Sequence, residues 1–186
     1  MPTDKKVETI VLMVDLQPKL TASLDKEKCT RLLQSICFFG DAINCLGIPT
    51  IMTEQVPEKL EPTHRNVKEH FSNAIFFQKD SFSAFGCEAF CRWVSDHGVK
   101  HIVVGGIETA ICIFLTAQEA ISRNLKVTVI ADCVLGRREK DSIVSLEELS
   151  KRGVKILSSE TILYSLMGTA SHSKFREISK LVRDRC

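Results

Sequence analysis

Residues 101–112 read HIVVGGIETAIC, a very apolar run that passes through two glycines and ends on Cys112. Continuous apolar runs of this kind are typical of strands in a parallel sheet that helices cover on both faces. The residues that follow, to about position 123, place apolar side chains at helical spacing. We therefore expect a buried strand over 101–104, a turn at Gly105 and Gly106, and a helix whose first turn carries Cys112.

The same alternation of strand and helix patterns continues along the chain in both directions. Strands are expected at residues 8–15, 48–52, 74–78, 101–104, 126–130 and 154–157. Amphipathic helices are expected at about 27–46, 87–97, 112–123 and 139–152, with helical segments closing the chain. Six strands that alternate with helices predict an α/β fold: a three-layer α/β/α sandwich around a six-stranded parallel sheet, with right-handed crossovers. We expect one domain spanning residues 1–186.

Residues 54–72 hold two prolines and many charges between the second and third predicted strands. This composition predicts a long loop with at most a short helix. Loops of this length in compact domains are commonly functional.

The composition gives the chain no strong electrostatic field. It has 25 basic and 23 acidic residues, for a net charge of +2, and 44% of its residues are hydrophobic. Nucleic acid and anionic membranes are therefore not expected as partners. The longest apolar runs have the length of strands, and residues 1–6 lack the apolar region of a secretory signal. We expect a soluble, cytoplasmic protein.

Eight cysteines raise the question of disulfides or a metal, but none of them forms a C-x-x-C pair. Cys29, Cys37 and Cys45 are eight residues apart along one predicted helix. This spacing suits reduced cysteines on a half-buried helical face. We expect no metal site and no cofactor.

Three reactive residues come at the ends of predicted strands. Asp15 closes the first strand, Lys79 follows the third, and Cys112 follows the fourth. Because the carboxyl ends of parallel strands share one edge of a sheet, these side chains are expected to meet there. A helix N-terminus lowers the pKa of a thiol, and a carboxylate and an ammonium beside it suit an activated nucleophile. Taken singly, each residue also has a purely structural explanation: Asp15 as a turn residue, Lys79 as a solvated loop charge and Cys112 as a core cysteine.

The motifs around these residues resemble those of the isochorismatase-like cysteine hydrolase family. Asp15 with Gln17, then Lys79, then residues 106–112 match the family in order and spacing, over essentially the whole chain. Residues 53–55 and 166–175 are similar to its small isochorismatase-domain-containing branch. The resemblance implies a Rossmann-like fold and an Asp15, Lys79 and Cys112 triad. It also implies a homo-oligomer, a dimer or larger.

The resemblance further implies a cis peptide between Ile107 and Glu108 in the catalytic turn. Backbone N–H groups of this turn, including that of Cys112, would then face the developing oxyanion. The weaker candidates for substrate contacts are Gln17, Gln55, Phe82 and Thr109. For the glutamines an exposed loop position is the alternative, and for Phe82 the core or a subunit interface.

Two departures from the family narrow the expected reaction. Nicotinamidase-type members carry a D-x-H pair and a further His after the second strand to hold a metal, whereas this chain reads Thr53-Glu54-Gln55. True isochorismatases hydrolyse a vinyl ether without needing a thiol. The sequence therefore predicts a metal-independent hydrolase of C–N bonds in a small amide or ureido substrate, acting through a thioester.

Two other classes stay open at this point. The chain could be a catalytically weak ligand-binding or redox-sensing protein on the same scaffold, with Cys133 as the resolving thiol. Nucleic-acid processing is the third class.

Overall fold

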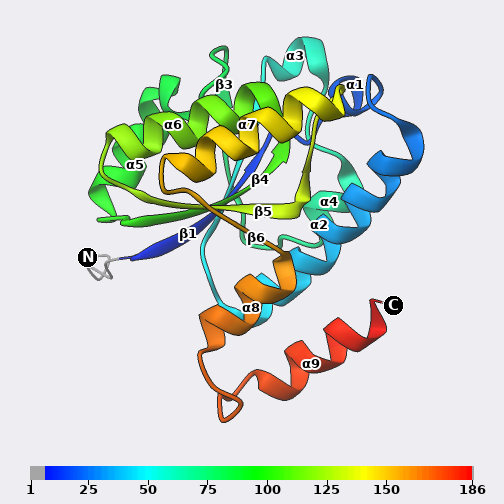
Figure 1. Cartoon of the computed structure of the whole chain (residues 1–186), viewed down its shortest axis with the longest axis vertical. Coiled ribbons are helices and arrows are strands. Elements are labelled where there is room, and N and C mark those ends of the chain that lie inside the picture. Colours follow the sequence, from blue (N-terminus) through cyan, green and yellow to red (C-terminus); the bar gives the residue numbers. More distant parts are fainter. Residues whose placement is uncertain (1–6, 186) are drawn as a thin grey trace.

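The computed structural model describes residues 7–185 (Figure 1). Six strands form one sheet in the order β3-β2-β1-β4-β5-β6, and all neighbouring strands are parallel. Their bounds are β1 Thr9–Val14, β2 Thr50–Gln55, β3 Ile75–Lys79, β4 His101–Ile107, β5 Lys126–Leu135 and β6 Lys155–Leu157. The predicted six-stranded α/β fold is confirmed. Residues 1–6 and 186 of the predicted domain lie outside the described residues.

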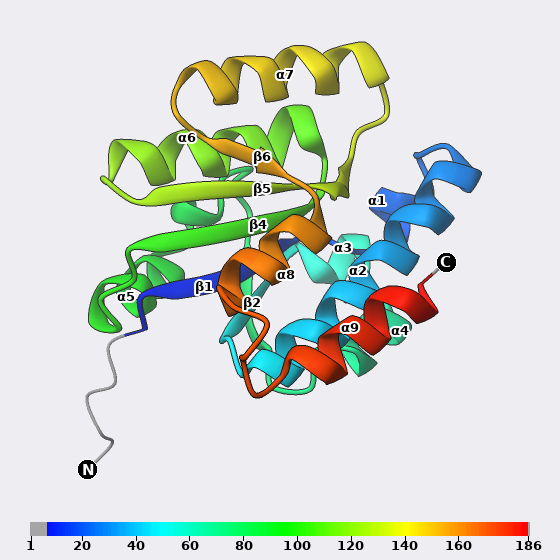
Figure 2. The ribbon, with the colours of Figure 1, turned by 60° about the horizontal axis from the view of Figure 1, so that its bottom comes forward.

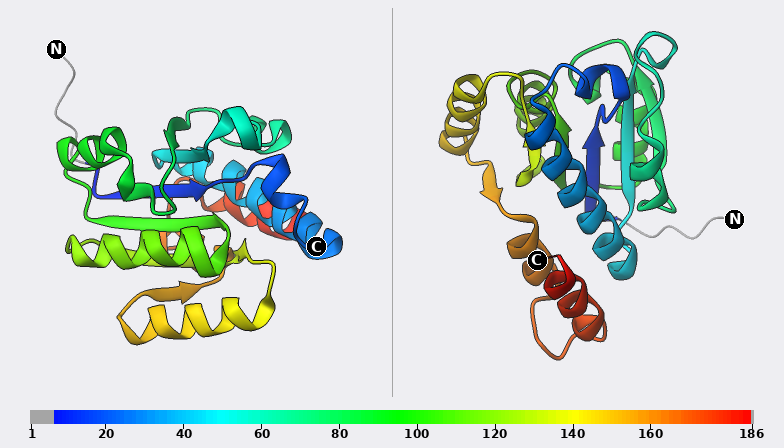
Figure 3. Two further views of the ribbon diagram at one scale, coloured as in Figure 1. Left: turned by 90° about the horizontal axis from the view of Figure 1, so that it is seen from above. Right: turned by 90° about the vertical axis from the view of Figure 1, so that its right-hand side faces the viewer.

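Helices cover both faces of the sheet (Figures 2 and 3). On one face lie α2 (Lys26–Leu46), α4 (Arg65–Glu69), α8 (Ser159–Met167) and α9 (Phe175–Asp184). On the other lie α5 (Glu88–Asp96), α6 (Phe114–Ser122) and α7 (Glu139–Lys151). The short elements are α1 (Pro18–Thr21), α3 (Pro57–Leu60), a 3₁₀ turn (Ala84–Gly86) and a π-helical turn (Thr109–Ile113).

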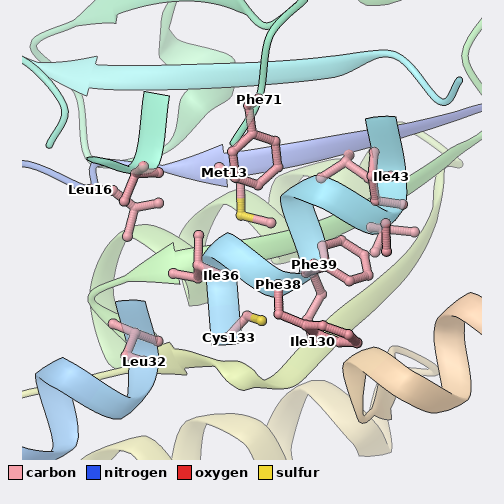
Figure 4. Close-up of a cluster of buried hydrophobic side chains, with 14 of the residues drawn as sticks. Met13, Leu16, Leu32, Ile36, Phe38, Phe39, Ile43, Phe71, Ile130 and Cys133 are labelled. Atoms are coloured by element: carbon pink, nitrogen blue, oxygen red, sulfur yellow. The ribbon is translucent and has the colours of Figure 1, made fainter. Parts of the chain in front are cut away.

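Strand β1 divides its side chains between two hydrophobic clusters, as the two-residue period of a strand requires. Val11 and Met13 pack in the cluster under α2, whereas Leu12 and Val14 pack in the cluster under α5 and α6. Figure 4 shows the first cluster, where Met13 lies close to the side chains of α2. Because both faces of β1 are fully buried, its residues are almost all apolar.

The second and fifth strands differ most from their predicted bounds, and β5 continues past residue 130 to Leu135. β2 begins at Thr50 and continues to Gln55, so residues predicted as loop pair with β3, Glu54 with Gln78 and Gln55 with Lys79. The end of this strand was not predicted because its side chains are polar and do not fit the apolar pattern of a buried strand. The buried carboxylate of Glu54 accepts from the backbone N–H of Thr63 at 2.8 Å. The remainder of the predicted loop contains α3 and α4.

The helix predicted to begin with Cys112 has a different start. Cys112 lies in the π-helical turn Thr109–Ile113, and the α-helix begins two residues after Cys112, at Phe114. A π turn adds a residue to each helical repeat and recurs at functional sites.

Candidate active site

Asp15 and Lys79 form a fully buried ion pair at the carboxyl edge of the sheet. Lys79 Nζ donates to Asp15 Oδ2 at 2.6 Å, and neither side chain is accessible to solvent. Asp15 follows β1 and Lys79 ends β3, so the pair spans β2, which lies between them. A buried ion pair is tolerated only when its remaining hydrogen bonds are satisfied.

Neighbouring groups supply those hydrogen bonds. Lys79 Nζ also donates to Gln55 Oε1 at 2.9 Å and to the carbonyls of Ser81 at 3.0 Å and Phe82 at 3.2 Å. Thr53 Oγ1 donates to Asp15 Oδ1 at 2.7 Å. Both charges are therefore held in place by β2 and by the loop after β3.

The thiol of Cys112 joins this unit from the π-helical turn. Its Sγ lies 3.7 Å from Gln55 Oε1 and also interacts with the carboxylate of Asp15. Cys112 is 7% exposed, so the sulfur is almost closed off from water. The structure thus brings together the three residues that the sequence singled out from three separate strand ends.

The pKa of the Cys112 thiol is raised to about 12. Burial is the main cause and the neighbouring charge of Asp15 acts in the same direction, whereas Lys79 acts in the opposite direction. The expectation of a thiol with a lowered pKa is therefore wrong, because desolvation and the carboxylate of Asp15 outweigh the effects of Lys79 and of the backbone hydrogen bond at Glu108. Burial also raises the pKa of Asp15, against the effects of Lys79, Thr53 and Cys112. At neutral pH the thiol keeps its proton, and a base with a raised pKa lies next to it.

Iodoacetamide should therefore modify Cys112 slowly at pH 8. With a pKa of about 12, only about one thiol in ten thousand is ionised there, and the rate should rise about tenfold per pH unit. The rate at Cys112, followed by mass spectrometry of its peptide between pH 7 and 10, checks this. A plateau below pH 8 would contradict the raised pKa.

The turn that carries Cys112 is fixed by its neighbours. The peptide bond between Ile107 and Glu108 is cis. The carboxylate of Glu108 accepts from Arg137 Nε at 2.8 and 3.0 Å, which ties the turn to the segment after β5. Gly106, with φ at +118°, lies so close to β1 that an added Cβ would stand 2.1 Å from the carbonyl oxygen of Val14.

The four weaker candidates have different surroundings. Gln55 lies at the site, between Lys79 and Cys112. The hydroxyl of Thr109 is buried and has no hydrogen-bond partner within residues 7–185. Phe82 presents its carbonyl to Lys79, while the residue as a whole is 57% exposed.

Gln17 is fully buried and its amide is occupied by backbone groups. It donates to the carbonyls of Gln55 at 3.0 Å and Glu61 at 2.6 Å, and it accepts from the N–H of Gln55 at 2.7 Å. Gln17 therefore orients Gln55 and leaves no amide group directed at a substrate. Sequence reasoning missed Thr53, although its position two residues before Gln55 on one strand places both on the same side.

A hollow of about 430 Å³ lies beside the turn that carries Cys112. Glu108, Ala110 and Ile111 line it from the turn, Arg137 and Arg138 line it from the segment between β5 and α7, and Ser142 lines it from α7. It offers room for a small polar molecule next to the residues that carry Cys112.

Cys133 is not placed to resolve a disulfide with Cys112. Cys133 is fully buried in the cluster under α2, whereas Cys112 belongs to the cluster on the opposite face of the sheet. Both thiols are free.

The histidines of the segment between β2 and β3 contact helices away from the site. His64 Nε2 lies 2.7 Å from Thr21 Oγ1, and His70 Nδ1 lies 2.8 Å from Asp41 Oδ1. Within residues 7–185, no three His, Cys, Asp or Glu side chains are grouped so that they could hold a metal ion. In the same part of the chain, no helix has the length and apolar character needed to span a bilayer.

Comparison with known proteins identifies the family. A model of the isochorismatase domain matches residues 9–161. The chain belongs to the isochorismatase domain family. Isochorismatase domain-containing protein 1 of Salmo salar is 29% identical over 184 residues, which cover 94% of this chain and 65% of that protein. Isochorismatase domain-containing protein 2 of Bos taurus is 33% identical over 141 residues, with 75% and 67% covered. This chain thus spans less than two thirds of the salmon relative.

Solved structures agree with the family assignment. The MAR1 ribonuclease from Caenorhabditis elegans has a TM-score of 0.87 at 27% identity, with 96% of this chain and 91% of that one covered. The second structure is the ycaC gene product of Escherichia coli, which is described as an octameric hydrolase of unknown specificity. Its TM-score is 0.74 at 19% identity, and the match covers 100% of both chains. The latter likeness concerns the fold alone. Family and fold thus agree with the resemblance that the motifs of the chain indicated.

Proposed function

We propose that this isochorismatase-like hydrolase is a metal-independent cysteine hydrolase that cleaves C–N bonds of small amides or ureido compounds. The observation that carries the proposal is the buried ion pair of Asp15 and Lys79 with the thiol of Cys112 beside it, since Cys112 and Lys79 both donate to Gln55 Oε1. It joins a nucleophile, a base and a fixed positive charge, as covalent catalysis requires. The hollow beside the catalytic turn would hold the rest of the substrate.

Acylation begins when the carbonyl carbon of the substrate lies against Cys112. Asp15 takes the proton of the thiol while sulfur forms the new bond to carbon, and Lys79 keeps its charge beside both groups. The tetrahedral intermediate then breaks its C–N bond. The leaving nitrogen takes the proton from Asp15 and departs as an amine or ammonia, which leaves a thioester on Cys112.

Deacylation returns the enzyme to its starting state. Asp15 accepts a proton from water while the water oxygen adds to the thioester carbon. The C–S bond then breaks, the acid product leaves, and the sulfur regains its proton from Asp15. In both halves the backbone N–H of Cys112 and its turn would face the oxyanion, where each donor contributes about 3 kcal/mol.

The raised pKa of Cys112 is compatible with this role. A proton that moves from the thiol to Asp15 stays within the unit, so the sulfur need not lose its proton to water. General bases are most effective when their pKa approaches the working pH, and burial moves that of Asp15 in this direction.

The test is a panel of primary amides and ureido acids, assayed for release of ammonia or amine. Substrates should be cleaved by the parent and by Cys91→Ala, a control at a half-buried cysteine, but not by Cys112→Ala. Intact mass spectrometry of the parent during turnover should reveal an acyl adduct that hydroxylamine removes. Turnover that survives in Cys112→Ala would refute the nucleophile.

A nuclease activity is the alternative suggested by the Caenorhabditis elegans neighbour, which is described as a ribonuclease. The net charge of +2 provides little attraction for RNA, so the absence of a nucleic-acid partner stays our prediction. Cleavage of RNA by the parent but not by Cys112→Ala, with binding that weakens steeply with salt, would favour the nuclease instead.

We also propose that the chain forms a homo-oligomer and works in the cytoplasm. An octameric neighbour of the same fold supports assembly. Exposed Phe82 and Leu115 line one hollow on the surface near the site and would suit a subunit contact.

A further inference from the structure

Thr53 contacts the proposed base from the strand next to it. Its hydroxyl donates to Asp15 Oδ1 at 2.7 Å, and its carbonyl accepts from the backbone N–H of Asp15 at 3.1 Å. Both residues are fully buried, so no water competes for these contacts. The position of the carboxylate is therefore set by β2 as well as by Lys79.

The two oxygens of Asp15 have different partners. Oδ1 accepts from Thr53 and Oδ2 accepts from the ammonium of Lys79. The only titratable groups that face Asp15 are Lys79 and Cys112, among the residues that the structure describes. Glu54, the neighbour of Thr53, turns the other way and pairs with Lys68 at 3.1 Å. The hydroxyl of Thr53 is thus an uncharged donor that stabilises the carboxylate beside Lys79 and the thiol of Cys112.

We propose that Thr53 is a positioning residue that holds Asp15 as a hydrogen-bonded carboxylate and thereby sets how readily Asp15 takes the proton of Cys112. This inference rests on the coupled Asp15 and Cys112 of the proposed function. It does not depend on which substrate the enzyme uses.

The direction of the effect follows from the donor that is lost. Without the hydroxyl the carboxylate is less stable, so Asp15 holds a proton more tightly and withdraws it more often from the thiol. The fraction of thiolate at neutral pH then rises. A hydrogen bond to a charged group corresponds to about a tenfold change or more in such an equilibrium.

The experiment compares three variants of the full chain by alkylation with iodoacetamide from pH 6 to 9. Thr53→Val should raise the rate at Cys112 by about tenfold or more. Thr53→Ser keeps the hydroxyl and should stay within about threefold of the parent. Thr50→Val is the matched control, since Thr50 is buried on the same strand and its hydroxyl has no partner within residues 7–185. It should leave the rate unchanged.

Equal rates in Thr53→Val and Thr50→Val, or a lower rate in Thr53→Val, would overturn the proposal. If Thr53→Val does not fold, Thr53→Ala against Thr53→Ser makes the same comparison. Asp15→Asn distinguishes a failure of the role of Thr53 from a failure of the coupling between Asp15 and Cys112. If Asp15→Asn changes the rate at Cys112 and Thr53→Val does not, the role of Thr53 fails alone; if neither changes it, the coupled site fails with it.

Discussion

Asp15→Asn should lower the hydrolysis of any accepted amide by about 10³-fold, the usual contribution of a general base. The same variant should make Cys112 react faster with iodoacetamide at pH 8, by about tenfold or more. The reason is that the carboxylate holds the pKa of the thiol up, so its removal favours the thiolate. If the sulfur becomes more reactive while turnover is lost, the thiolate alone is not sufficient for hydrolysis and the proton transfers by Asp15 are also required.

Two assays on one preparation measure these opposite changes: amide turnover and mass spectrometry of the Cys112 peptide. Slower alkylation in Asp15→Asn would contradict the assigned electrostatics, and retained turnover would remove Asp15 from the mechanism. The variant leaves Lys79 buried without its partner, which costs about 3–5 kcal/mol of folding stability. The double variant with Lys79→Met removes both charges and should be more stable than Asp15→Asn alone.

Gly106→Ala should destabilise the fold by more than about 4 kcal/mol, because it combines overpacking with backbone strain, two of the few causes of losses of this size. Gly106 pairs with Val14 in the sheet, and an added Cβ would stand 2.1 Å from the carbonyl oxygen of that residue. Its φ of +118° is also unfavourable for alanine. Since the atoms of Val14 that an added Cβ would meet are backbone atoms, no side-chain movement relieves the contact. Urea unfolding followed by circular dichroism measures the change.

Gly153→Ala is the matched control for this prediction. Gly153 also has a positive φ, +88°, but nothing within 4 Å of the position of an added Cβ. That variant should lose only the conformational term, about 1–2 kcal/mol. Similar losses at both positions would mean that the contact with Val14 contributes nothing.

The sequence predicted β1 and the start of β4 well because these central strands are apolar runs that are buried on both faces. Residues 8–15 and 101–104 correspond to β1 and to the first part of β4. The end of β2 was missed because polar residues there bond with other polar groups inside the protein, which no hydropathy pattern reveals. Burial and apolar character did not suffice at the end of β4, where the strand continues through Gly105 and Gly106 to the buried Ile107 although a turn was expected at the glycines.

The site could be predicted in its membership but not in its electrostatics. Parallel strands bring their carboxyl ends to one edge, so Asp15, Lys79 and Cys112 could be grouped from their positions alone. The direction of the thiol's pKa shift depends on depth and on distances to two charges, which sequence does not give. The task of Gln17 likewise depends on which backbone groups lie near its amide.

The ion pair of Lys79 and Asp15 keeps the net charge around the sulfur constant during the proposed proton transfer. With the proton on sulfur the three side chains sum to zero charge, and with the proton on Asp15 they sum to zero again. No counterion therefore has to enter or leave when the nucleophile forms, and ions in solution can hardly screen side chains that water does not reach. The chemistry at the sulfur is thus insulated from the ionic strength of its surroundings.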